Sequence, residues 1–327
     1  MYIKRLIALA GAVIGIAVEA NAQTVDYSIP FVPEESGLDI MKISSDNDYV
    51  CMPEVKRSKR LFSWATNRIL DVSNDGANIA YLSYRNDATN IFIKELGKQG
   101  GSVQRTNRKN VLDFAYSSNG KTICFSENRG ATNQIFITDA VSGYVCRQIT
   151  SANIDSAPKY TSDMKQILFT RMESNSSSIW GYNIESNFVL SYTNGADPCP
   201  IGPTTFLCTR KNSENRNEIW KIDYSTGVEE CIVADPEHSY ASPVVSPDGK
   251  WILFVGESVI SGEDFIFRNA DIYACRLDGT QLTQITYHAA DDLSPVWSRD
   301  GKYIYFVSQR GSATATANIW RLTFQYY

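Results

Sequence analysis

The chain has 327 residues, of which 43% are hydrophobic and 20% are charged, and its formal net charge is -5. This composition is typical of a globular protein with one large domain or two ordinary ones. The acidic balance, with a pI of about 5.2, argues against a nucleic-acid partner, which would need a basic surface.

The first 22 residues have the pattern of a secretory signal peptide. Lys4 and Arg5 form a short basic start, residues 6–18 form an uncharged apolar run, and Ala20-Asn21-Ala22 supplies the small residues that a signal peptidase needs. The apolar run is too short to span a bilayer as a helix, and no later run is long enough. We therefore predict a protein without a transmembrane segment, periplasmic or otherwise exported, with cleavage after Ala22.

Residues 23–63 form an N-terminal segment that precedes the first repeat. Leu38–Ile43 and Tyr49–Met52 alternate in the manner of short strands. The alternative is a disordered leader that extends to Arg60, which the polar runs and the prolines of this segment favour.

From residue 64 onward, two sequence features repeat in phase. The first is a Ser-x-Asp-Gly-Lys turn followed by an Ile-x-Phe run, and a search for such repeats decides the fold. It is clear at Ser246–Phe254 and Ser298–Phe306, weaker at Ser73–Tyr81, Ser117–Phe125 and Ser162–Phe169, and reduced to Phe206–Cys208 in the fourth copy. The second is a polar residue, an isoleucine and an aromatic residue, at Asn90–Phe92, Gln134–Phe136, Ser178–Trp180, Glu218–Trp220, Asp271–Tyr273 and Asn318–Trp320.

The spacing of these features predicts an all-β fold. Successive isoleucines of the second feature are 40 to 53 residues apart, which fits propeller blades of four strands. Helical solenoids have similar periods, but short runs between Asp-Gly or Asn-Gly turns favour strands. We predict a six-bladed β-propeller of four-stranded antiparallel blades over residues 64–327. The last copy ends soon after its third strand, so we expect one of the two N-terminal runs to close that blade as its outer strand.

The pattern Ser-Pro-x-x-Ser-x-Asp-Gly-Lys-x-Ile-x-Phe, seen best at Ser242–Phe254 and in large part at Ser294–Phe306, resembles the TolB-type propeller repeat, a relative of the WD repeat. The resemblance implies the propeller fold and little about function, because this repeat serves many activities. It covers the propeller alone. The separate N-terminal α/β domain of TolB has no counterpart in the roughly 40 residues between the signal and the first blade.

Seven cysteines are present, and no C-x-x-C spacing occurs among them. This removes the commonest zinc and redox motifs. Buried free thiols and a single disulfide both remain compatible with an odd number of cysteines.

The candidate binding residues fall on one face of the predicted ring. In a four-stranded meander, the Asp-Gly turns lie on one face, here called the turn face. The more varied connections lie on the other, here called the loop face, where functional residues are more common. Three candidates there are aspartates that each stand three residues before a proline of an inner strand: Asp155, Asp197 and Asp292. Tyr240 holds the matching place in the fifth copy, and both histidines of the chain, His238 and His288, lie in the same set of connections. Phe265 and Phe267 lie in the Glu257–Ala270 loop.

Two simpler readings accompany these candidates. Arginines end the second strand of most copies on the same face, so the aspartates could form structural ion pairs with neighbouring blades. A bound cation held by the aspartates is the other reading, although two histidines make a poor metal site. The arginines are Arg85, Arg129, Arg171, Arg210 and Arg310.

The chain carries no Gly-x-Ser-x-Gly elbow, zinc-peptidase motif, P-loop or dinucleotide fingerprint. We therefore predict no catalytic residue, metal or cofactor, and a monomeric propeller that binds a protein partner in a cell-envelope complex. Carbohydrate binding or cleavage, with Tyr240, Tyr287, Phe265 and Phe267 facing sugar rings, is the alternative. An exposed apolar patch on the loop face would favour the binder, and a deep channel mouth with converging carboxylates would favour the alternative.

Overall fold

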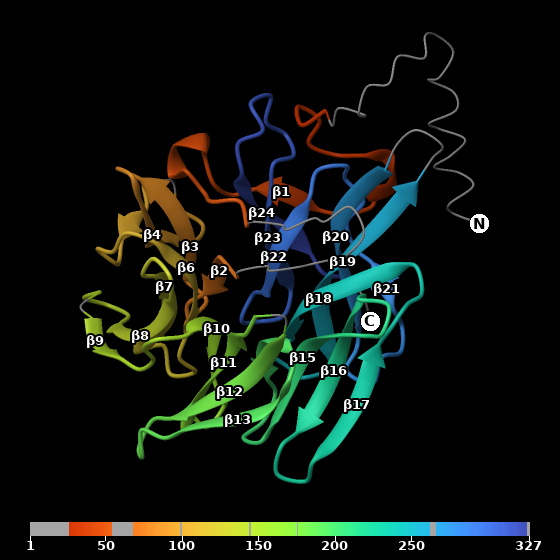
Figure 1. Ribbon diagram of the computed structural model, residues 1–327. Coiled ribbons are helices and arrows are strands. Elements are labelled where there is room, and N and C mark those ends of the chain that lie inside the picture. The colour runs from red at the N-terminus through yellow and green to blue at the C-terminus, as the bar shows by residue number, and fades with distance from the viewer. Residues whose placement is uncertain are drawn as a thin grey trace.

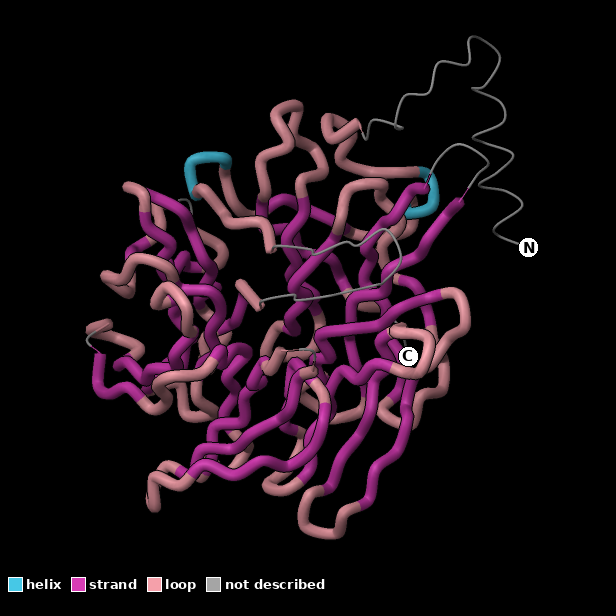
Figure 2. The backbone as a smooth tube through the Cα atoms, in the orientation of Figure 1, coloured by secondary structure: helices cyan, strands magenta, loops and turns pink. Residues whose placement is uncertain are grey.

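The computed structural model describes residues 26–53, 68–98, 100–143, 145–174, 176–261 and 266–325. The predicted signal peptide lies outside these ranges. The described residues form strands and two short 3-10 helices, η1 (Pro33–Glu35) and η2 (Asp46–Asp48), with no α-helix among them (Figure 2). In this part of the chain, no helix has the length and apolar character needed to cross a membrane.

The strands group into six four-stranded antiparallel meanders, numbered here as blades 1 to 6 (Figure 1). Blades 1 to 3 comprise β2 (Leu70–Val72), β3 (Asn78–Arg85), β4 (Ala88–Glu95) and β5 (Val103–Gln104); β6 (Val111–Tyr116), β7 (Thr122–Asn128), β8 (Asn133–Asp139) and β9 (Val145–Gln148); and β10 (Ile154–Tyr160), β11 (Gln166–Met172), β12 (Ser177–Asn183) and β13 (Val189–Asn194). Blades 4 and 5 comprise β14 (Ala196–Pro200), β15 (Thr205–Lys211), β16 (Asn217–Asp223) and β17 (Val228–Val233); and β18 (His238–Val245), β19 (Trp251–Ser261), β20 (Ile266–Arg276) and β21 (Thr283–Gln284). Blade 6 comprises β22 (Asp292–Trp297), β23 (Tyr303–Ser308), β24 (Asn318–Thr323) and β1 (Ile40–Lys42).

The inner strands of the blades surround a common axis. β2, β6, β10, β14, β18 and β22 contact one another in this order, and β22 contacts β2, so the ring is closed. A single parallel pairing, Ile154 with Asn133, also links blades 2 and 3. The prediction of an all-β propeller of four-stranded antiparallel blades is confirmed.

The N-terminal segment closes blade 6, as predicted. β1 pairs with β24 in antiparallel register, with Ile40 opposite Leu322 and Lys42 opposite Trp320. The second predicted run has another place: Val50 bridges Ser83 of β3 in blade 1. Residues 26–53 therefore pack on the propeller across its seam, and the disordered-leader alternative does not apply to them.

The Ser-x-Asp-Gly turn between the first two strands of a blade is built by three hydrogen bonds. In blade 5, the Ser246 hydroxyl donates to Asp248 Oδ1 at 2.5 Å, and the N–H groups of Lys250 and Trp251 donate to Asp248 Oδ1 and Ser246 Oγ. Gly249 takes a φ of +72°, which only glycine adopts at no steric cost. The same bonds recur in blades 1, 2, 3 and 6, so the repeated motif is a turn-forming device.

The second repeated feature forms the core between blades. Its isoleucine is completely buried in all six blades: Ile91, Ile135, Ile179, Ile219, Ile272 and Ile319. Its aromatic residue is capped in several blades by the arginine that ends the preceding strand. Arg171 lies 4.4 Å from the Trp180 ring centre and Arg210 lies 5.0 Å from that of Trp220. Cation–π contacts of this kind give the arginine series a structural role.

Candidate functional site

The inner strands of blades 3 to 6 share a bulge before a proline. The bulged residues have positive φ, and the pairing register shifts at each of them. They are Ala157, Asp197, Ser242 and Ser294. Asp197 is thus two positions beyond the counterpart of Asp155, because Pro198 rather than Pro200 follows the bulge. The sequence does not show which of the two prolines follows the bulge, so counting three residues back from Pro200 placed Asp197 at the wrong register position.

Asp155 lies at the loop end of β10 and is fully buried. Its two carboxylate oxygens accept hydrogen bonds from Arg171 at 2.8 and 3.0 Å. Arg171 belongs to β11 of the same blade, so the ion pair is within a blade and not between neighbours as expected. Both ends of the carboxylate are occupied by this bidentate pair.

Asp292 belongs to a buried ion cluster, called here the Arg310 cluster. Arg310 donates to both oxygens of Glu35 at 2.8 and 3.0 Å and also to Asp292, and all three side chains are fully buried. Burial and the nearby Asp292 carboxylate raise the pKa of Asp271 beside them. Glu35 reaches this cluster from the N-terminal segment, so the cluster fastens that segment to blade 6.

The two histidines have separate structural partners. His238 Nδ1 lies 3.0 Å from Asp235, and its ring stacks on Tyr240. His288 is buried: Nδ1 accepts from the Ala290 N–H, and Nε2 lies 2.8 Å from the Ile29 carbonyl. Burial and the positive charge of Arg310 lower the pKa of His288. Within the described ranges, no group of three or more His, Cys, Asp or Glu side chains is placed to hold a metal ion.

Of the three predicted aromatic candidates, Tyr240 lies in β18, and Phe265 and Phe267 belong to the Glu257–Ala270 insertion. Tyr240 is 1% exposed and packs against Phe254 and Tyr273, so it is a core residue. Phe265 lies outside the described residues, and Phe267 lies in β20. The Glu257–Ala270 insertion, expected as a loop, is mostly a continuation of the β19–β20 hairpin, because Glu257 to Ser261 pair in register with Ile266 to Ala270. This hairpin projects beyond its blade in Figure 1.

Exposed apolar side chains do occur at the loop face. Ile154 begins β10 and Met172 ends β11; they are register partners, and each is 44% exposed. In blade 1, Tyr84 and Tyr49 are each 55% exposed, and the Tyr84 N–H donates to the Tyr49 carbonyl. At the loop face, Ile154 and Met172 lie directly opposite each other, and an adjacent pair of exposed apolar groups is suited to a docking contact.

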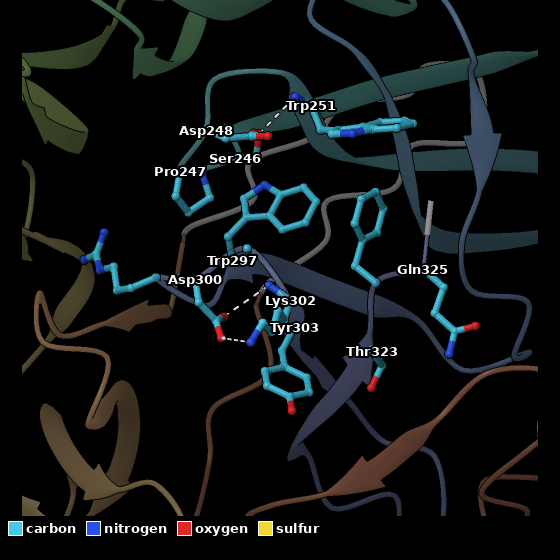
Figure 3. Close-up of a pocket in the computed structure, with 13 residues that line it drawn as sticks. Ser246, Pro247, Asp248, Trp251, Trp297, Asp300, Lys302, Tyr303, Thr323 and Gln325 are labelled. Carbon is cyan, nitrogen blue, oxygen red and sulfur yellow. Dashed lines mark hydrogen bonds and ion pairs between the residues drawn. The ribbon is translucent and has the colours of Figure 1, made fainter. Parts of the chain in front are cut away.

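The turn face carries two hollows. One, of about 840 Å³, lies over the turns of blades 5 and 6 (Figure 3). Trp251, Trp297 and Phe324 form its floor in edge-to-face contacts at 5.2 and 4.8 Å. Both tryptophans are buried, so the rings pack on one another more than they face the hollow. Asp300 and Lys302 stand at the rim in Figure 3.

The second hollow, called here the axial funnel, has a volume of about 540 Å³ and lies where the axis opens on the turn face. All six blades line it. Each inner strand contributes one residue at the same register position, opposite the middle of its neighbouring strand. These six residues are Asp71, Ala115, Lys159, Cys199, Val244 and Val296. The sequence does carry a signal for Lys159, because a lysine stands where four of the other five copies have alanine, cysteine or valine.

The molecule is a six-bladed β-propeller, since it has six meanders around an axial funnel and an N-terminal strand that closes the ring. A family model described as the TolB beta propeller domain matches residues 66–267, and the chain belongs to this family. No curated protein sequence matches it.

Solved structures share the fold at low sequence identity. TolB from Acinetobacter baumannii has a TM-score of 0.58 at 18% identity over 76% of this chain, which spans 64% of that protein. An oligogalacturonate lyase from Vibrio parahaemolyticus has a TM-score of 0.59 at 11% identity over 90% of this chain and 96% of that one. Kuenenia stuttgartiensis hydrazine synthase has a TM-score of 0.56 at 14% identity over 73% of this chain and 73% of that one. Such different proteins support the fold alone.

Proposed function

We propose that this propeller is an exported, non-catalytic platform that binds a protein partner in the cell envelope through its loop face. The observation that carries the proposal is the exposed apolar pair Ile154–Met172, together with Tyr49 and Tyr84 at the same face. The signal-peptide pattern of the sequence supports the compartment.

The arrangement of acids supports binding over catalysis. Asp155 and Asp292 are buried and hydrogen-bonded to arginines, and they do not converge on an open cavity. Tyr240, the shared candidate for sugar stacking, is in the core. Phe265 and Phe267, which belong to the Glu257–Ala270 insertion of the sequence, stay as predicted contacts to the partner.

The test compares capture of a partner by three forms of the protein. The wild type is expected to retain a stoichiometric protein from envelope extracts, and the purified pair should re-form with a Kd of micromolar or below. The double variant Ile154→Asp, Met172→Asp should lose at least tenfold in affinity, because it places charge in the apolar contact.

Val141→Asp is the matched control. Val141 is 76% exposed but lies in a turn-face loop of blade 2, so its replacement should leave binding unchanged. Absence of any stoichiometric partner, or equal losses in both variants while thermal unfolding is unaltered, would contradict the proposal.

A further inference from the structure

The axial funnel is positively charged in a protein whose formal net charge is -5. Among the described residues that line it, the cations are Arg68, Lys159 and Arg299, and the one carboxylate is that of Asp71. A concave surface with low-dielectric walls concentrates the field of such charges. The funnel therefore attracts anions although the molecule as a whole repels them.

The cations of the funnel are held by main-chain carbonyls. Lys159 Nζ donates to the Phe114 carbonyl at 3.1 Å, and Arg68 donates to the Pro243 carbonyl at 3.2 Å. Arg299 donates to the Ser73 carbonyl at 3.1 Å. These carbonyl bonds orient the side chains and carry no neutralising charge, although Arg299 also forms a long ion pair with Asp71, at 3.9 Å.

Lys159 is 8% exposed, and no carboxylate of the described residues lies within ion-pairing distance of its ammonium. The nearest acids are engaged elsewhere. Asp113 accepts from the Ser126 hydroxyl and the Ala157 N–H, and Asp71 accepts from the Tyr116 N–H. Two of the three ammonium protons thus have no acceptor among these residues, and a buried cation in this state favours a bound anion.

Electrostatics agree with this geometry. Burial, with the positive charge of Arg68, lowers the pKa of Lys159 to about 8. The lysine is still mostly protonated at neutral pH. An anion in the funnel would offset both the desolvation of the ammonium and its repulsion by Arg68.

We propose that the axial funnel is a binding site for a small organic polyanion, one with two or more carboxylate or phosphate groups. Lys159 binds one anionic group at the inner end, and Arg299, whose side chain is 40% exposed, meets another at the rim. A volume of about 540 Å³ is in the range of sites for small ligands. The site is on the face opposite the proposed partner surface, so the two proposals can fail separately.

Titration calorimetry at low ionic strength tests the site with three probes: citrate, pyrophosphate and an acidic peptide of alternating Asp and Gly. We expect citrate or pyrophosphate to bind with a Kd below about 1 mM, the tighter of the two identifying the anionic group. Lys159→Met should weaken that binding at least tenfold, and Lys165→Met, at an exposed position of the same blade, should change it less than twofold.

Arg299→Met is the second variant, because Lys159 is buried and Arg299 is at the rim; it should weaken binding at least threefold while thermal unfolding is unchanged. The proposal is overturned if neither small anion binds the wild type at millimolar concentration. Binding of the peptide alone, or equal affinity in wild type and both funnel variants, overturns it as well.

Discussion

Replacing Arg310 by methionine leaves two buried carboxylates, Glu35 and Asp292, without the cation that neutralises both. Removing one partner from a buried ion pair typically costs about 3–5 kcal/mol, because the remaining charge stays desolvated. A whole domain is stable by only about 5–15 kcal/mol. We therefore expect Arg310→Met to lose about 3–5 kcal/mol in urea unfolding at pH 7.

The loss should depend on pH. Burial already raises the pKa of Asp292 to about 6, and loss of the Arg310 charge raises it further above its unfolded value, so the folded state binds protons more strongly. Stability is then retained at low pH and lost as pH rises through the folded pKa of Asp292. The deficit of Arg310→Met should be smaller at pH 5 than at pH 7, whereas a packing defect would be equal at both.

Two further variants check this reasoning. Adding Glu35→Gln and Asp292→Asn to Arg310→Met should recover part of the loss, since both acids become neutral. Lys221→Met breaks a pair with Glu230 whose side chains are 36% and 55% exposed and should cost less than about 1 kcal/mol. The account is refuted if Arg310→Met unfolds within about 1 kcal/mol of the wild type at pH 7, or if its deficit is the same at both pH values.

Three other outcomes are expected. Ile40→Ala should cost about 2–4 kcal/mol in urea unfolding because Ile40 of β1 is buried. Met41 in the same strand is 42% exposed, so Met41→Ala should cost under about 0.5 kcal/mol. Equal losses would argue against the closing strand. Gly256→Ala should lower the melting temperature, with a cost of about 1–3 kcal/mol, because its Cβ would lie 2.5 Å from the Tyr273 ring; an unchanged melting temperature would contradict this packing. The folded pKa of Lys159 is below its unfolded value, so the free energy of unfolding of the wild type should rise between about pH 8 and pH 10 by up to about 3 kcal/mol. Lys159→Met should lack this rise, and parallel pH profiles of the two proteins would be inconsistent with a buried ammonium.

The fold was predictable because its signals are local. A serine, an acid and a glycine within four residues build a turn by themselves, as at Ser246–Gly249, and the buried isoleucine of the third strand repeats in every blade. Closure by Ile40–Lys42 followed from counting strands in the last copy. These inferences needed only neighbours in sequence and the requirement that a ring have no open edge.

The site depended on contacts that sequence spacing does not contain. Glu35 meets Arg310 across 275 positions, and no pattern near either residue indicates the other. Asp197 was misplaced because a one-residue bulge changes register without changing composition. Lys159 went unnoticed because its importance comes from five inner-strand residues of other blades that surround the same axis.

The pairing of β1 with β24 also determines when the molecule can become complete. Ile40 is paired with Leu322, so the first strand must wait without its partner until nearly all of the chain has been synthesised. Contacts of such large sequence separation are slow to form, and unpaired strand edges are prone to aggregation. Five blades can assemble as their strands appear, but blade 6 and the Glu35–Arg310 contact must form last. The interval before closure is therefore the period in which the edge of β24 is exposed and open to wrong pairing.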